Sequence, residues 1–237
     1  MSPLQQQQAR TRSGLFLSRR LQHLFDWRAL GTSLLDLVFP PTCVHCGRVD
    51  TTWCEACQAE LEHVPLSIIE GDLDLVDAAI GTAWHTGILQ HAVQALKYHN
   101  ARTLAQPLAK RLNVGIIQQA WPIDTLIPVP LHSLRLQNRG YNQAKLIAEA
   151  LSAQAGIPVV DALQRERNTP TQVGLNRTER LTNVEGAFVA TVPSNTKTAL
   201  IIDDVRTTGA TLTACAKALK NAGVPNVYAA TITVAEF

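Results

Sequence analysis

Two adjacent carboxylates followed by a loop of threonine and glycine are the residues of this chain best suited, by type and spacing, to chemistry. Asp203 and Asp204 end an apolar run over 199–202, and the loop after them reads VRTTGAT. The run predicts a strand buried on both faces, and apolar residues at helical spacing predict a helix over 212–221. This order of strand, loop and helix is suited to holding a phosphorylated sugar.

The loop offers hydrogen-bond donors to a phosphate group. Ligands of open α/β sheets bind at the carboxyl ends of the strands, where the next helix begins with free backbone N–H groups. A glycine lets the backbone approach a ligand closely, and threonine hydroxyls can bond to phosphate oxygens. The predicted phosphate cradle is Thr207, Thr208, Gly209, Ala210 and Thr211.

The acidic pair needs a different partner, because carboxylates repel a phosphate. We expect Asp203 and Asp204 to face sugar hydroxyls or a Mg²⁺ ion that also binds the ligand. The loop lacks the lysine of a Walker A sequence, which argues against an ordinary NTPase. The alternative is a polar strand end with no ligand, in which Thr211 only caps the helix.

Four cysteines form two C-x-x-C pairs, namely Cys43, Cys46, Cys54 and Cys57. Each pair can come from a tight turn, and two such turns can hold one zinc ion tetrahedrally. Two disulfides, a redox dithiol and an iron cluster are the alternatives, but the doubled pair in a cytosolic protein favours structural Zn²⁺. His45 lies inside the first pair, and we expect it to be a bystander because four cysteines complete the coordination.

A basic segment over 130–147 follows a predicted strand at 124–129 and contains no acidic residue. It predicts a second anion site, which suits a diphosphate because Arg135 and Arg139 can match phosphate oxygens with their guanidinium groups. A nucleic-acid backbone could use the same charges. An exposed loop without a ligand is the third interpretation.

The polar segment over 165–188 has little periodicity and is too long for a simple connection. It is typical of a lid that closes over a reactive group and brings Arg167, Arg177 or Arg180 near developing negative charge. The alternative is a mobile loop without a catalytic part.

The rest of the chain alternates strands with helices, which predicts an α/β fold with a mainly parallel sheet flanked by helices. We expect strands at 78–86, 124–129 and 227–234, and helices at 87–98, 103–119 and 142–154. We predict three parts: a disordered tail with an amphipathic helical segment over 1–42, a zinc-binding module over 43–65, and the α/β domain over 66–237.

Composition and charge exclude few functions. The net charge is +2 and charged residues are 17%, so neither nucleic acid nor a small anionic ligand is favoured. Apolar residues over 15–39 recur at helical intervals, which indicates helices that pack on the protein or an amphipathic helix for a membrane or partner. No apolar run approaches the ~18 residues of a membrane span, and we expect a cytoplasmic protein without a transmembrane segment.

The strand, acidic pair and TTGAT loop resemble the 5-phosphoribosyl 1-diphosphate (PRPP) signature of type I phosphoribosyltransferases. The chain from about residue 34 to residue 234 resembles the ComF-type competence family, which joins a zinc module to such a domain. The stretches that carry the resemblance are LLDLVFPPTCVHCG, WCEACQAEL, LKYHN, IPVPLHSLRLQNRGYNQAK and IIDDVRTTGATL. It also depends on GAF and on the spaced residues Arg165, Arg167, Thr169, Gln172, Leu175, Arg180 and Asn183. Arg206 is a departure, since many relatives have a smaller or uncharged residue there.

The resemblance implies roles for individual residues. Asp203 and Asp204 would hold the ribose hydroxyls, and the loop over 207–211 would hold the 5-phosphate. Arg135, Arg139 and Gly140 would lie in the loop that binds the diphosphate together with Mg²⁺, and the segment over 165–188 would be the flexible catalytic loop. The catalytic residues implied are Asp203, Asp204, Arg167 and Arg180.

Two functions fit these expectations. The first is a Mg²⁺-dependent phosphoribosyltransferase of the amidophosphoribosyltransferase type, connected through its family with competence and the use of imported DNA. The second is a non-catalytic competence factor that senses PRPP or binds single-stranded DNA and other competence proteins, with Tyr98 or Tyr141 stacking on bases.

Overall fold

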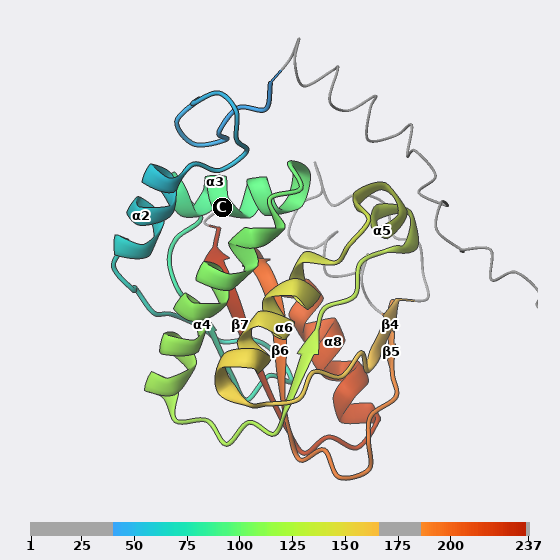
Figure 1. Ribbon diagram of the computed structural model, residues 1–237. Helices are drawn as coiled ribbons and strands as arrows, with labels where there is room; N and C mark the ends of the chain where they lie inside the picture. The colour runs from blue at the N-terminus through green and yellow to red at the C-terminus, as the bar shows by residue number, and fades with distance from the viewer. Residues whose placement is uncertain (1–39, 166–185, 236–237) are drawn as a thin grey trace, which may run out of the picture. The chain divides into compact units, whose positions relative to one another are not determined.

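The computed structural model describes residues 40–165 and 186–235 (Figure 1). The described residues from Pro41 onward form one compact unit. The predicted tail and helices over 1–39 lie outside the described residues, as do Arg167, Arg177 and Arg180. Within the two described ranges, no helix has the length and apolar character needed to cross a membrane.

A five-stranded sheet with the order β1-β2-β7-β6-β3 forms the centre of this unit. The strands are β1 (Ile69–Gly71), β2 (Ala78–Gly81), β3 (Thr125–Pro128), β6 (Thr198–Arg206) and β7 (Asn226–Val234). Only β1 runs antiparallel to its neighbour, and the pairs β2–β7, β7–β6 and β6–β3 are parallel. The predicted parallel sheet is therefore confirmed.

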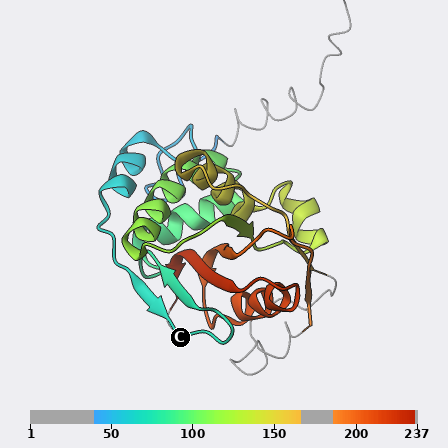
Figure 2. The same cartoon turned by 90° about the horizontal axis from the view of Figure 1, so that it is seen from below.

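Helices cover both faces of the sheet, as Figure 2 shows. On one face α3 (Gly87–Tyr98), α4 (Ala105–Gln119) and α6 (Gln143–Ala155) bury their apolar sides. On the other face α8 (Ala210–Asn221) packs together with a small antiparallel pair, β4 (Leu163–Arg165) and β5 (Phe188–Ala190). Because β6 is covered on both sides, its apolar half is a continuous buried run, as fully covered parallel strands require.

The structure differs from the predicted elements at several places. β2 ends at Gly81 and not at residue 86, where the chain leaves the sheet in an irregular path with one isolated bridge from Trp84 to Val234. A Cβ on Gly81 would lie 2.3 Å from Cγ2 of Val234, so glycine permits this close approach. The basic segment contains a short helix, α5 (Ser133–Arg139), that apolar periodicity did not predict because none of its residues is buried.

The cysteine-rich module packs on the same unit through α2 (Glu55–His63), whose buried residues contact α3. The cysteine-rich module therefore lies next to α3. Our boundaries of 1–42, 43–65 and 66–237 for the three parts remain a proposal.

Candidate functional site

The carboxyl ends of β3 and β6 place the predicted site residues at one edge of the sheet. The two strands pair in register, with Pro128 opposite Ile202, so that the chain leaves β3 beside the acidic pair while β6 continues to Arg206. Asp203 and Asp204 lie within β6 and not after it. Because successive side chains of a strand point to opposite faces, Asp204 lies on the side of α3 and Asp203 on the side of α8.

Asp204 is buried, with 3% of its surface exposed, and it has a basic partner. The Nζ atom of Lys97, in the last turn of α3, lies 2.7 Å from its Oδ1 atom. Burial lowers the pKa of Lys97, but the charge of Asp204 outweighs this effect and raises the pKa above its ordinary value. Oδ2 of Asp204 is buried and has no hydrogen-bond partner among the described residues.

Asp203 meets a different environment on the α8 side. Its Oδ1 atom accepts a hydrogen bond of 2.8 Å from the backbone N–H of Asp204. Burial and the charge of Asp204 raise the pKa of Asp203 to about 7, although Lys97 and Arg165 act in the opposite direction. Burial, followed by the charge of Asp203, raises the pKa of the Cys215 thiol as well. This cysteine is fully buried in α8 and acts as a small hydrophobe, as its spacing predicted.

His85 lies in the chain segment after β2 and is close enough to Lys97 and Asp204 to interact with their charges. Its Nδ1 atom lies 2.8 Å from the hydroxyl of Thr233 at the end of β7. Burial and then the charge of Lys97 lower the pKa of His85, which keeps the imidazole neutral at physiological pH. Neither His85 nor Lys97 was among our candidate site residues. The only signal for Lys97 was its place in the LKYHN stretch.

The threonine and glycine loop forms the N-terminus of α8. Gly209 occupies the position before the helix with φ of +81°, a conformation that favours glycine, and it has no side chain to cap the helix. The hydroxyl of Thr208 accepts a hydrogen bond of 3.4 Å from the N–H of Ala210 at the start of the helix. The cap that we considered for Thr211 is therefore not formed, since this residue already lies inside the helix. Thr207 and Thr208 are half-buried, and the first N–H groups of α8 face the same edge of the sheet as the acidic pair.

Arg206 does not add its charge to this loop. It is 7% exposed, and its Nη2 atom donates hydrogen bonds of 3.0 Å to the carbonyl oxygens of Ile69 and Glu70 in β1. Glycine at position 71 makes room for it, because a Cβ there would lie 1.4 Å from Nη1 of Arg206. Arg206 thus helps to hold β1 on the sheet.

The basic segment follows β3 at the same edge. Arg135 and Arg139 lie on α5, which ends at Gly140 with φ of +77°. The Arg139 guanidinium lies 5.3 Å from the ring centre of Tyr98, which is 71% exposed. The side chain of Asn142 caps α6 and donates a hydrogen bond of 2.9 Å to the carbonyl of Val129, which ties the segment to the end of β3.

Tyr141 is not available as a stacking platform. Its ring is 7% exposed, and its hydroxyl donates a hydrogen bond to the carbonyl of Leu96 in α3. The guanidinium of Arg102 covers the ring at 4.4 Å. Of the two tyrosines that we considered for base stacking, only Tyr98 is exposed.

The four cysteine sulfurs are placed to hold one structural zinc ion. All four Sγ atoms lie within 4.8 Å of one another. The sulfur separations are 3.7 Å between Cys43 and Cys57, 3.6 Å between Cys46 and Cys54, and 3.4 Å between Cys54 and Cys57. Zinc–sulfur bonds in a tetrahedron give sulfur separations of about 3.8 Å, whereas a disulfide needs about 2.05 Å.

The backbone of the module stabilises thiolates. Gly47 turns the chain with φ of +76°, and its N–H donates a 2.8 Å hydrogen bond to the carbonyl of Cys43. Burial alone would raise the pKa of the Cys43 thiol, but hydrogen bonds from the backbone of Cys46, Cys54 and His45 lower it to about 6. His45 is no ligand, and its Nδ1 atom lies 2.8 Å from Nδ1 of His91 in α3.

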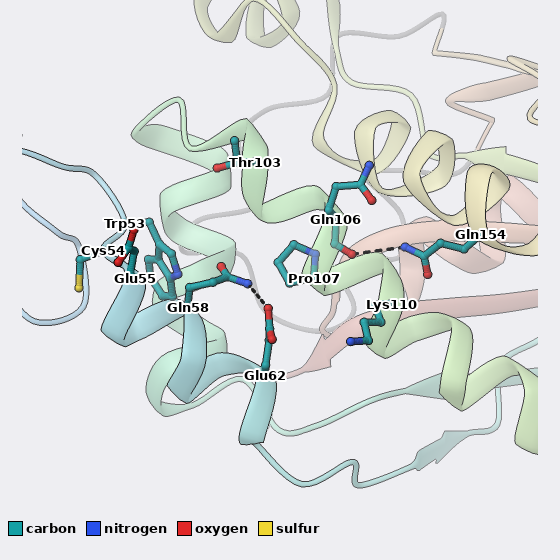
Figure 3. Close-up of a pocket in the computed structure, with 10 residues that line it drawn as sticks. All are labelled: Trp53, Cys54, Glu55, Gln58, Glu62, Thr103, Gln106, Pro107, Lys110 and Gln154. Carbon is teal, nitrogen blue, oxygen red and sulfur yellow. Dashed lines mark hydrogen bonds between the residues drawn. The ribbon is translucent and has the colours of Figure 1, made fainter.

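A groove of ≈ 480 Å³ lies away from the acidic pair, between α2 and the helices α4 and α6. Figure 3 shows its lining of Trp53, Glu55, Gln58, Glu62, Gln106, Lys110 and Gln154, among others. A hydrogen bond of 2.7 Å joins Gln58 to Glu62 inside it. The groove carries charges of both signs and includes none of the residues that we predicted to bind a phosphorylated sugar.

Comparisons with known proteins agree with this arrangement. Residues 136–234 match the phosphoribosyl transferase domain family, and residues 34–67 match the double zinc ribbon domain family. The first match contains most of α5 together with β6, the threonine and glycine loop, and α8, and the second contains the four cysteines.

Two relatives are similar to this chain over most of its length, and a third over less than half of it. Competence protein F of Haemophilus influenzae is 30% identical over 196 residues, which cover 79% of this chain and 82% of the relative. DNA utilization protein YhgH of Escherichia coli is 27% identical over 193 residues, which cover 78% and 85%. Competence protein ComFC of Streptococcus pneumoniae is 36% identical over 101 residues, which cover 43% and 44%. The chain belongs to the ComF-type competence family, in which a zinc module accompanies a phosphoribosyltransferase-type domain.

Proposed function

We propose that the chain binds PRPP at the carboxyl ends of β3 and β6 and transfers its phosphoribosyl group to an acceptor with loss of diphosphate. Asp204 carries this proposal. A carboxylate that is 3% exposed, with one oxygen that has no partner among the described residues, costs free energy unless a donor fills the place. A ribose hydroxyl is such a donor.

The N-terminus of α8 supports the second half of the proposal. The N–H groups of its first turn and the positive end of the helix dipole favour a phosphate, and Gly209 permits the left-handed turn that leads into the helix. The acidic pair and this helix start flank the same strand end. The ribose 5-phosphate part of PRPP has hydroxyls at one end and a phosphate at the other. It can therefore contact the acidic pair and the helix start at the same time.

The diphosphate would lie toward α5, where Arg135, Arg139 and the backbone at Gly140 supply positive charge and donors. Mg²⁺ bound with PRPP would neutralise charge on the departing diphosphate. Asp203 and Asp204 point to opposite faces, and Oδ1 of Asp204 is bound to an ammonium group. We therefore expect the ion to be held mainly by oxygens of PRPP, with Asp203 as the carboxylate that can reach it.

The protein itself would act mostly by positioning and electrostatics. The acidic pair fixes the ribose, and the loop over 207–211 fixes the 5-phosphate, so that the anomeric carbon is held while the bond to diphosphate breaks. Arg167 and Arg180 belong to the segment that we expect to close over the reacting groups. We connect this activity with competence and DNA utilization, because the names of the relatives contain these words.

A calorimetric titration of the zinc-loaded protein with PRPP and Mg²⁺, combined with an assay of diphosphate release, tests the proposal. The parent should bind PRPP, and Asp204→Asn should weaken binding about tenfold to hundredfold, because a hydrogen bond to a charged acceptor is lost. Asp161→Asn, which changes an exposed carboxylate, should have no effect. No binding by the folded parent would refute the proposal.

The same assay distinguishes a phosphoribosyltransferase from the alternative, a non-catalytic factor. Binding of PRPP without diphosphate release, across nitrogen bases, ammonia and single-stranded DNA as acceptors, would favour a factor that senses PRPP. The exposed ring of Tyr98 next to Arg139 is the observation that favours contact with single-stranded DNA. Loss of DNA binding in Tyr98→Ala, with PRPP binding unchanged, would support that function.

A further inference from the structure

Lys97 lies on helix α3, whereas the acidic pair lies on strand β6. Helix α3 ends at Tyr98, and its last turn brings the ammonium of Lys97 to within 2.7 Å of Oδ1 of Asp204. The side chains are 20% and 5% exposed, respectively, so solvent screens this ion pair far less than a pair on the surface.

The ion pair gives the two carboxylate oxygens of Asp204 different environments. Oδ1 is occupied by the ammonium of Lys97, whereas Oδ2 is buried without a partner among residues 40–165 and 186–235. A carboxylate whose rotation is fixed by a cation on one oxygen presents the other oxygen in a fixed direction. A ligand hydroxyl can bond to that oxygen without first reorienting the side chain.

A positive charge at this place also changes what else can bind. A divalent cation would need carboxylate oxygens with their negative charge uncompensated. The ammonium compensates the charge of Asp204, and Asp203 points to the other face, where it lies near Arg165. The two carboxylates therefore do not form a chelating pair.

We propose that Lys97 is a positioning residue for the sugar: its ammonium takes the place on Asp204 that a divalent cation would have and leaves Oδ2 as the acceptor for a sugar hydroxyl. The part that concerns the sugar rests on the proposed function, whereas the part that concerns the cation does not. It follows that a pentose phosphate without a diphosphate binds independently of divalent cations.

Ribose 5-phosphate is the probe, because it has the hydroxyls and the phosphate but no diphosphate to recruit Mg²⁺. In Mg²⁺-free buffer the zinc-loaded parent should bind it, and Lys97→Met should weaken its binding about tenfold or more. Lys97→Arg should restore much of the affinity. Lys110→Met removes an exposed lysine of α4, outside the site, and should bind as the parent does.

Two readouts distinguish positioning from a merely structural role. Added Mg²⁺ should strengthen binding by Lys97→Met and leave binding by the parent unchanged, because the ion replaces the missing ammonium only in the variant. Lys97→Met combined with Asp204→Asn should bind no more weakly than Asp204→Asn alone, since Lys97 acts through Asp204. Equal affinities of Lys97→Met and the parent, or additive losses, would overturn the proposal.

An NMR measurement on the parent tests the role of Lys97 even if a variant does not fold. The ammonium signal of Lys97, assigned by its disappearance in Lys97→Arg, should be sharp because the ion pair slows proton exchange. It should not move when Mg²⁺ alone is added. A shift on Mg²⁺ addition would show that the ion displaces Lys97 and would refute the proposal. If ribose 5-phosphate and PRPP both fail to bind, the proposed function fails, and this measurement still decides the role of Lys97.

Discussion

Neighbouring carboxylates of β6 meet different surroundings, and this difference gives them different chemistry. Asp204 is paired with Lys97, at 2.7 Å. Asp203 faces α8, where burial and the charge of Asp204 raise its pKa to about 7. Near neutral pH, Asp203 can therefore gain or release a proton within the site, while Asp204 serves as an ionic anchor.

The raised pKa of Asp203 predicts how stability depends on pH. In the unfolded chain this carboxyl titrates near its ordinary value of 3.8, and in the folded chain near about 7. Between these values the folded protein binds the proton more tightly, so the contribution of Asp203 to stability falls as pH rises and stays unfavourable above the folded pKa. Asp203→Asn removes this effect, because an amide does not ionise.

Thermal unfolding of the zinc-loaded parent and of Asp203→Asn at several pH values checks this prediction. The variant should gain in Tm relative to the parent as pH rises from about 5 to about 8. Asp161→Asn is the matched control, since the side chain of Asp161 is 60% exposed. A Tm difference for Asp203→Asn that does not change with pH would contradict the raised pKa.

At the residue scale, short motifs were predictable and pairings across the fold were not. The cysteine pairs and the acidic pair stand out because their members are close in sequence. Lys97 and His85 escaped notice because a lysine at a helix end and a histidine after a short strand are ordinary features. Their proximity to Asp204 arises only when β6, β7 and α3 assemble.

The start of α8 is the element on which the predicted phosphate cradle depends. Gly209 has φ of +81°, and a Cβ at this position would lie 2.2 Å from Cδ2 of Leu73, in the connection between β1 and β2. Any other residue at this position would therefore have a strained backbone, and its Cβ would clash with Leu73. Gly156, which follows α6, has φ of +72°, but a Cβ at that position would project into open space.

Gly209→Ala and Gly156→Ala form a matched pair that separates these two effects. Each places a Cβ in the left-handed region, which costs roughly 1 kcal/mol. Gly209→Ala must also displace Leu73, which adds about 1–3 kcal/mol of overpacking. Urea unfolding should show the larger loss of stability for Gly209→Ala, and this variant alone should lose PRPP binding. Equal losses of stability would show that Leu73 moves freely.

Elements with a long apolar face were predictable, and short or polar ones were not. The predicted helix over 87–98 coincides with α3, since its apolar residues recur at helical spacing. Helix α5 buries no residue, and β4 and β5 have three residues each, so periodicity gave no signal for them. The end of β2 depends on the approach of Val234 to Gly81, which is a tertiary contact.

At the scale of the described unit, the zinc module and the proposed sugar site share helix α3. His45 of the module contacts His91 in α3 and lies 3.5 Å from Glu60 in α2. The same helix ends with Lys97 at the acidic pair. The module contacts the middle of α3, and Asp204 contacts its end. Unfolding of the module can therefore loosen α3 and displace Lys97 from Asp204.

Removal of zinc tests this connection. Metal analysis of the purified protein should find one zinc per chain, and a chelator should unfold the module, because metal binding contributes directly to its folding. Without the contacts from α2 and His45, α3 loses part of its packing. We therefore expect faster amide hydrogen exchange in α3 and weaker PRPP binding in the zinc-free protein.

Helix α8 is the internal control for that experiment, because it packs on the opposite face of the sheet and belongs to the other apolar cluster. Its exchange should be unchanged when the module unfolds, so that any loss of PRPP affinity has to come through α3 and Lys97. Faster exchange in both helices would indicate global destabilisation, and unchanged exchange in α3 would separate the module from the site. Under the proposed coupling, Lys97→Met should lose less PRPP affinity on zinc removal than the parent does, because the affected contact is already absent.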